Sequence, residues 1–425
     1  MMNPALTDPP AERRIYPWFL VGLLWFCGFF NYADRQAVYS VFPQLKDEFH
    51  LSNAGLGMLG SSFALVYAFS SPLAGLVVDR VSRRWLIPAG LAVWSLVCAA
   101  TGTSRTFGQL LIYRAAEGLG ESFYFPASMS LLADYHGPRT RSRALGLHQT
   151  SVYAGTAAGG ILAGMIGQTY GWRTPFLLLG LIGTVFAFAL PWLIREPVRG
   201  AADPKPAPQP GDEFLPPPPE GVWANLATIT RVPAALTLIG VFAGANFVAT
   251  TLLAWLPQFV KTKHGLDLSQ SATVAGLFFP IGNAVGALVG GTLADAMARK
   301  VKGGRVLVQA SGLIVGAPCV WFVGTADSLA VLVPSLVAIG LCKGVYDANI
   351  FASLFDVVPS PVRGTAAGLM NTVGWGAGSA APLVVGLLSD QYGLGAVIGW
   401  TAAVYLAAGL FALFAARLTA RAVVA

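Results

Sequence analysis

The chain has 425 residues, of which 55% are hydrophobic and 11% are charged, and its formal net charge is +7. A typical soluble domain carries about 25% charged residues, so this composition excludes an ordinary soluble globular protein. The mean hydropathy of +0.62 agrees. We therefore expect an all-α membrane protein that crosses the lipid bilayer many times.

Apolar segments of about twenty residues, the length that a helix needs to cross a bilayer, recur along the whole chain. The first, Trp18 to Phe42, is too long for a removable signal peptide, and we expect it to remain as a span. We predict twelve transmembrane helices, at 16–43, 54–79, 85–103, 107–133, 143–168, 174–194, 232–259, 270–296, 305–323, 328–356, 363–389 and 395–416.

A proline-rich segment separates the first six spans from the last six. Nine prolines lie between Pro197 and Pro219, and such a stretch favours a semi-extended linker over a helix. We predict three parts: an N-terminal six-helix bundle at 1–196, a cytoplasmic linker at 197–223 and a C-terminal six-helix bundle at 224–425.

The basic residues are distributed unevenly between the two sides of the predicted membrane. With the N-terminus placed inside the cell, 19 of the 27 Lys and Arg residues fall on the cytoplasmic side and five outside. This positive-inside bias predicts two cytoplasmic termini, and it accounts for the net charge without a nucleic-acid partner. We expect a monomeric, multi-pass protein of the plasma membrane, which is the inner membrane in a bacterium. The remaining three basic residues, Arg35, Arg114 and Lys343, lie within predicted spans.

The fourth predicted span contains three charged residues, Arg114, Glu117 and Glu121. At about 100° per residue, Arg114 and Glu121 project almost in register, and Glu117 lies roughly 60° away. A charge at the centre of a spanning helix costs several kcal/mol, so it rarely persists without a partner or a water-filled cavity. Glu121 can bind a proton in such a place, and the planar fork of Arg114 suits a carboxylate or phosphate. We interpret Glu117 as a counter-charge to Arg114.

Two other spans carry polar candidates. Asp34 and Arg35 are adjacent in the outer half of the first span, and Lys343, Tyr346 and Asp347 follow one another along the tenth. Lys343 and Asp347 either neutralise each other as an i, i+4 pair or contact a substrate, and Tyr346 either hydrogen-bonds a substrate or packs. Weaker candidates for a cavity are Asn246, Trp255, Asn283, Asn371 and Trp375.

The two halves of the chain resemble each other. The pattern G-x-x-x-D-x-x-x-R follows the second span of each half at an offset of 216 residues, with Asp79 and Arg83 in the first copy and Asp295 and Arg299 in the second. A second match, at an offset of 222 residues, aligns the fourth span with the tenth and places Lys343 opposite Glu121. Parallel repeats of this kind are one known way of building transporters.

These motifs and the six-plus-six layout resemble the major facilitator superfamily over essentially the whole chain. Asn31 to Arg35, and Arg114 with Gly118, Gly120 and Glu121, are similar to the anion:cation symporter and Spinster-like branches. Phe125 to Ala127 favours the former branch, whereas Gly120 to Tyr124 favours the latter.

The resemblance implies two pseudo-symmetric six-helix bundles and a role for each matching residue. It assigns proton coupling to Asp34 and Glu121, and anion binding to Arg35 and Arg114, with Lys343, Tyr346 and Asp347 as further substrate contacts. Gating would fall to the loop-motif residues: Asp79, Arg83, Asp295 and Arg299.

The leading hypothesis is a proton-coupled symporter of a small organic anion, such as a carboxylate, that works by alternating access. The alternative is a Spinster-like carrier of a lysophospholipid or another amphipathic lipid. A third hypothesis, a membrane-embedded enzyme or sensor, lacks a nucleophile–base–acid set in the sequence. We expect no cofactor and no metal, because none of the four histidines has metal-ligand spacing and no ATP-binding signature is present.

Overall fold

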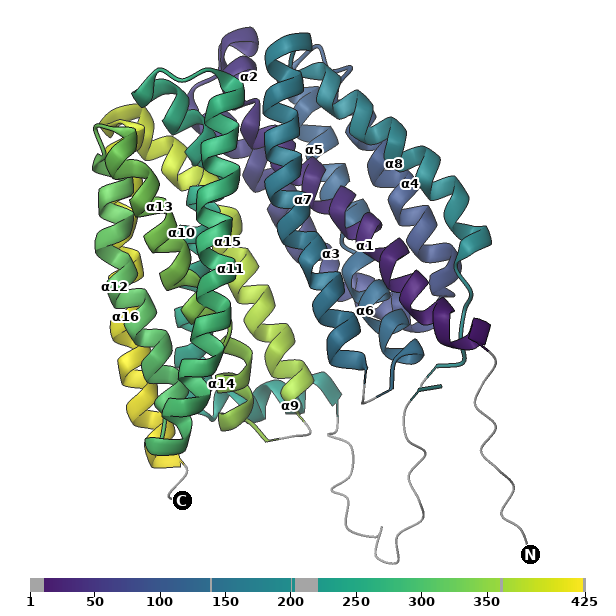
Figure 1. Ribbon diagram of the computed structural model, residues 1–425, viewed down its shortest axis with the longest axis vertical. Coiled ribbons are helices and arrows are strands. Elements are labelled where there is room, and N and C mark those ends of the chain that lie inside the picture. The colour runs from purple at the N-terminus through teal and green to yellow at the C-terminus, as the bar shows by residue number, and fades with distance from the viewer. Residues whose placement is uncertain (1–10, 138–139, 200, 203–220, 360–361, 423–425) are drawn as a thin grey trace, which may run out of the picture.

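The computed structural model describes residues 11–137, 140–199, 201–202, 221–359 and 362–422. The described secondary structure is helical, and Figure 1 shows the helices in two groups that lean against each other. The first group contains α1 (Ala11–Ser40), α2 (Phe42–Phe49), α3 (Asn53–Arg80), α4 (Arg83–Thr101), α5 (Phe107–Glu121), α6 (Tyr124–Tyr135), α7 (Arg141–Tyr170) and α8 (Arg173–Leu193).

The second group begins after the proline-rich segment. It contains α9 (Gly221–Thr230), α10 (Pro233–His264), α11 (Leu268–Lys300), α12 (Gly304–Thr325), α13 (Leu329–Asp347), α14 (Ile350–Val357), α15 (Arg363–Tyr392) and α16 (Leu394–Ala422). Most of the predicted linker, residues 203–220, lies outside the described residues, and its predicted end at 221–223 is the start of α9.

Within the described residues, ten helices are long and apolar enough to cross a membrane. They correspond to ten of the twelve predicted spans, so the chain is a multi-pass membrane protein. The predicted fourth span corresponds to α5 and α6, each of which is too short by itself, and the predicted fifth span corresponds to α7.

The predicted fourth span is interrupted at Ser122 and Phe123. Pro126 follows in the first turn of α6, where it has no N–H to give and its ring opposes the carbonyl of Ser122. The Ser122 hydroxyl donates instead to the Leu119 carbonyl at 2.8 Å. The same interruption occurs between α13 and α14, where the Asn349 side chain donates to the Gly290 carbonyl at 3.1 Å. Both breaks lie directly beyond charged residues of the two repeats.

The two groups touch through α3 with α15 and through α7 with α11. The Asp390 carboxylate accepts the backbone N–H groups of Asn53 and Ala54 at 2.9 and 3.0 Å, and the Gln168 side chain accepts that of Leu268 at 3.0 Å. All of these residues lie near the end of the molecule that carries α2, here called the α2 end. In Figure 1 the groups diverge toward the opposite end, where α9 and α14 lie.

Glycines allow the close contact between α3 and α15. A Cβ atom on Gly57 would lie 2.3 Å from the Pro382 carbonyl oxygen, and one on Gly386 would lie 2.4 Å from the Asn53 carbonyl oxygen. Each of these neighbours is backbone, so neither can rotate away. The α2 end therefore stays closed only while these positions have no side chain.

Gly57→Val is expected to open the α2 end. Overpacking of this kind costs about 1–3 kcal/mol, which is enough to shift the balance between closed and open forms by about tenfold. Spin labels at the exposed positions Tyr170 and Tyr392, one on each group, report the separation of the groups by electron–electron resonance. Longer distances are expected in the variant than in the parent protein.

The matched control is Gly240→Val, because a Cβ atom at Gly240 meets nothing within 4 Å. Equal distance distributions in Gly57→Val and Gly240→Val would contradict the closing role of the α3–α15 contact.

Candidate functional site

A cavity of about 280 Å³ lies between the two groups of helices. Helices α1, α3 and α7 line it from one side, and α10, α11, α13 and α15 line it from the other. Toward the α2 end, Gln36 closes it by donating to the Leu253 carbonyl at 3.0 Å. A site built in this way changes its walls whenever the two groups move relative to each other.

Arg35 is the cation on the α1 wall of the cavity. Its Nε donates to the carboxylate of Glu121, the last residue of α5, and the two side chains are 10% and 0% exposed. The guanidinium carbon also lies 4.6, 4.9 and 4.5 Å from the ring centroids of Tyr32, Phe63 and Tyr67. Aromatic faces stabilise a desolvated cation, so Arg35 is held at the cavity surface by one carboxylate and three rings.

Arg114 does not line the cavity and is fully buried. It pairs with Glu117, one turn along α5, and lies over the Phe63 ring at 4.8 Å. Glu117 is thus its counter-charge, as the sequence suggested. The expected coupling of Arg114 to Glu121 is not observed, because Arg35 of α1 reaches Glu121 instead.

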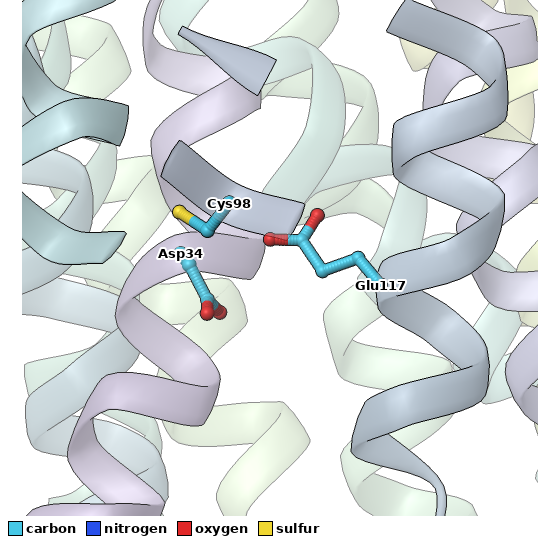
Figure 2. A group of neighbouring side chains, drawn as sticks. All are labelled: Asp34, Cys98 and Glu117. Carbon is cyan, nitrogen blue, oxygen red and sulfur yellow. The ribbon is translucent and has the colours of Figure 1, made fainter. Parts of the chain in front are cut away.

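Asp34 lies behind the cavity, in a cluster with Cys98 and Glu117. Figure 2 shows the three side chains converging from α1, α4 and α5, and their ligand-type atoms lie within 4.8 Å of one another. The Asp34 carboxylate accepts the Arg35 backbone N–H at 2.7 Å. Two carboxyls and a thiol are a conceivable metal-ligand set. However, the Arg114 guanidinium already occupies Glu117, so the arrangement suits a proton better than a metal ion.

The opposite wall of the cavity carries Lys343 and Asp347 from α13. The Lys343 ammonium donates to both carboxylate oxygens of Asp347 at 2.6 Å, and Asn283 of α11 donates to the same carboxylate at 3.3 Å. All three line the cavity. Tyr346 points elsewhere: it is fully buried and does not line the cavity, so the structure places it among packing residues.

Of the weaker candidates, Asn246, Asn283 and Trp375 line the cavity, whereas Trp255 and Asn371 do not. The buried Trp255 indole donates to the Pro382 carbonyl at 3.2 Å, which is a packing role. Sequence reasoning missed the remaining polar lining: Tyr32, Gln36, Tyr39, Gln149, Tyr153, Thr156 and Thr250. Spacing held a signal for three of these, because Tyr32, Gln36 and Tyr39 share the helix face of Arg35.

Arg83, one of the predicted gating residues, joins three segments at the end opposite α2. It is fully buried, and it donates to Asp134 at 2.5 Å, to Ser130 at 2.7 Å and to Glu196 at 2.8 Å. Partial burial opposes ionisation of Glu196. Hydrogen bonds from the Arg84 backbone N–H, Arg83 and Ser82 outweigh that effect, and they hold the pKa of this carboxyl below its usual range.

The second copy of the loop motif uses a different arginine. Arg305 donates to Asp356 at 2.9 Å and to Asp295 at 3.2 Å, whereas Arg299 is exposed at the end of α11. Arg83 and Arg305, like Asp134 and Asp356, are 222 residues apart, so Arg305 is the structural counterpart of Arg83. Asp79 lies in α3, and its side chain is outside the described part of the chain.

The chain matches the family model of the Major Facilitator Superfamily over residues 24–382. It is 26% identical to the hexuronate transporter of Bacillus subtilis (strain 168), over 92% of this chain and 91% of that one. It is 27% identical to protein spinster homolog 1 of Homo sapiens, over 88% and 73% of the two chains. A crystal structure of a bacterial homolog of the human lysosomal transporter Spinster, inward-facing and unoccupied, has the same fold. Its TM-score is 0.85 at 20% identity, and the match covers 96% of this chain and 98% of that one.

Glu196→Gln is expected to lower thermal stability at neutral pH, because Arg83 and the N-terminus of α4 lose a charged partner. Hydrogen bonds to charged groups contribute about 1.5–3 kcal/mol each, before solvent screening of this half-buried site reduces the effect. The pKa of Glu196 is lowered in the folded protein, so its stabilisation is present above the ordinary carboxyl pKa and disappears as pH falls through the lowered value.

Melting curves across pH check this expectation. The difference between parent and variant should be largest near pH 7 and should vanish below about pH 4. Asp47→Asn, at an exposed position, is the control and should leave stability unchanged. A pH-independent difference would show that Glu196 acts by packing and not by charge.

Proposed function

Because the chain belongs to the Major Facilitator Superfamily, a family of membrane transporters and not of enzymes, we propose that it carries a small organic anion together with protons by alternating access. Two cations on opposite walls of one cavity support this function most directly. Arg35 comes from α1 of the first group, and Lys343 comes from α13 of the second. An anion between them contacts both moving parts of the protein.

Arg35 is the binding residue for the acidic group of the substrate. Its Nε donates to Glu121, which leaves the outer edge of the guanidinium for a carboxylate. Lys343 is already paired with Asp347, so it contributes less free charge to an incoming anion. This asymmetry favours a substrate with one acidic group at the Arg35 end.

Competition for Arg35 couples the anion to a proton. When a carboxylate binds the guanidinium, it weakens the contact between Arg35 and Glu121. A buried carboxylate without a partner is costly, so Glu121 then binds a proton. Release of the anion restores the ion pair and expels the proton. Anion and proton therefore cross together without any change in the overall fold of either group.

The polar lining indicates a hydroxylated carboxylate, such as a sugar acid. Gln36, Gln149, Asn246, Thr250 and Asn283 offer amide and hydroxyl groups around the space between Arg35 and Lys343. Such groups hydrogen-bond alcohols and add no charge. The name of the Bacillus subtilis relative, a hexuronate transporter, agrees with this chemistry.

An amphipathic lipid anion is the alternative substrate, in keeping with the Spinster relatives. The observation that favours it is the aromatic part of the lining, which includes Phe63, Phe279 and Trp375. A thermal-shift screen of sugar acids, aromatic acids and lysolipids, followed by uptake of the hits, separates the two substrates.

We further propose that the protein is a monomer in the plasma membrane with both termini in the cytoplasm. The positive-inside bias supports this orientation. The α2 end then faces outward, so the closed contact between α3 and α15 shuts the external side while the two groups diverge toward the cytoplasm. Arg83 and Arg305 lie at the cytoplasmic side in this orientation, where gating requires contacts that form and break.

Glu121→Gln is expected to abolish the stimulation of uptake by external acid, because the side chain can no longer bind or release a proton. Counterflow of labelled against unlabelled substrate, which needs no net proton movement, should persist. Uptake into proteoliposomes measures both. Asp327→Asn, whose side chain is 95% exposed, is the matched control and should keep the stimulation. Undiminished acid-driven uptake in Glu121→Gln would refute the coupling role.

Arg35→Lys is expected to raise KM for the anion at least tenfold, since an ammonium cannot present the planar fork or stack on three rings. Concentration-dependent uptake at fixed pH measures this. Lys300→Ala, at an exposed position near the end of α11, should leave KM unaltered. An unchanged KM in Arg35→Lys would remove Arg35 from the binding site.

A further inference from the structure

The buried charges of the first group do not balance. Among the described residues, five acidic or basic side chains are buried around α1 and α5, each no more than 9% exposed. Three are acids and two are bases: Asp34, Glu117 and Glu121, and Arg35 and Arg114. An uncompensated charge in such a place costs several kcal/mol, whereas a bound proton removes it. One carboxyl of the three therefore holds a proton in the empty protein.

The ion pairs indicate which carboxyl is protonated. Arg35 donates to Glu121, and Arg114 donates to Glu117. Asp34 has no guanidinium partner among the described contacts, and it accepts only the neighbouring backbone N–H of Arg35. The proton therefore belongs on Asp34.

Glu117 is the closest acidic neighbour of that proton. Its second carboxylate oxygen, Oε1, is buried without a hydrogen-bond partner in the described structure, and the head group points toward Cys98 and Asp34 (Figure 2). Asp34 and Glu117 thus share one negative charge, and Arg114 balances it.

Other titratable or charged groups face this pair from each neighbouring helix. They are Tyr32, Arg35 and Tyr39 on α1, Tyr67 on α3, Cys98 on α4, and Arg114 and Glu121 on α5. Among them only Arg35 and Arg114 are cations, and Arg35 is engaged by Glu121. Arg114 is the one cation left to balance Asp34 and Glu117.

We propose that Asp34 and Glu117 form an interchangeable pair that keeps one proton and one negative charge throughout the transport cycle and so balances Arg114. This inference rests on the proposed function, and it changes the role that the family resemblance assigns to Asp34. Glu121 becomes the only one of the three carboxyls that exchanges the transported proton. Glu117 is a positioning residue, because it holds Arg114 away from the cavity.

The proposal sets the stoichiometry. The empty site is neutral with one proton on the pair. A bound monovalent anion adds one negative charge, and a second proton, on Glu121, restores neutrality. One proton then accompanies each monovalent anion, and no net charge crosses the membrane.

A set of variants tests the pair in proteoliposomes. Asp34→Asn and Glu117→Gln each leave one carboxylate for Arg114, so each variant alone should keep the stimulation of uptake by external acid. The double variant leaves Arg114 unbalanced, and acid-stimulated uptake should fall at least tenfold. Adding Arg114→Gln to the double variant removes the unbalanced charge and should restore acid-stimulated uptake. A membrane potential imposed with valinomycin should not change uptake by the parent protein.

Loss of acid stimulation in Asp34→Asn alone, while Glu121→Gln behaves as proposed, would overturn this inference and leave the proposed function intact. Acid-driven uptake that persists in Glu121→Gln would instead overturn the proposed function. Failure of Arg114→Gln to rescue the double variant would also count against the pair.

Infrared spectroscopy gives a second readout that needs no transport. The empty parent protein at neutral pH should show the band of a protonated carboxylic acid. The band should be absent from Asp34→Asn and from Glu117→Gln, since the remaining carboxyl is then ionised against Arg114, and it should persist in Asp47→Asn. A missing band in the parent protein, or an unchanged band in Asp34→Asn, would contradict the proposal.

Discussion

The ion pair between Arg35 of α1 and Glu121 of α5 is the interaction on which the arrangement of the site depends. Both side chains are removed from water inside the first group of helices, where neither charge is stable alone. The pair holds Arg35 against three aromatic rings at the cavity wall, and it places Glu121 directly behind the binding position. Any anion that enters the cavity competes with Glu121 for the same guanidinium.

The helix geometry around this pair follows the internal repeat of the chain. Helix α5 ends at Glu121, and helix α13 ends at Asp347, so each break places a carboxylate at the last residue of a helix. In the second group, Lys343 and Asp347 neutralise each other, and both remain at the cavity wall. The two groups therefore present unequal charges to one cavity: an arginine that can exchange partners faces a lysine that already has one.

Much of the architecture could be predicted from the sequence, because hydrophobic length and the positive-inside bias report the membrane directly. Ten predicted spans correspond to helices of sufficient length and hydropathy, and the buried charged residues were identified from their cost in a bilayer. The pairing of those charges could not be predicted. Helix periodicity placed Arg114 in register with Glu121, but it contains no information on how closely α1 approaches α5, and that approach gives Glu121 to Arg35. For the same reason Tyr346 was indistinguishable from a cavity residue, and Arg305 was hidden by a change of spacing between the repeats.

The most direct measurement of the central claim is the number of protons that the purified protein takes up when it binds its anion. Calorimetric titrations in buffers of different ionisation enthalpy give that number without any membrane. If the anion displaces Glu121 from Arg35, the parent protein takes up close to one proton for each anion bound near neutral pH, and Glu121→Gln takes up none. Binding of the anion to the parent protein with no proton uptake across the pH range would contradict the exchange of partners at Arg35.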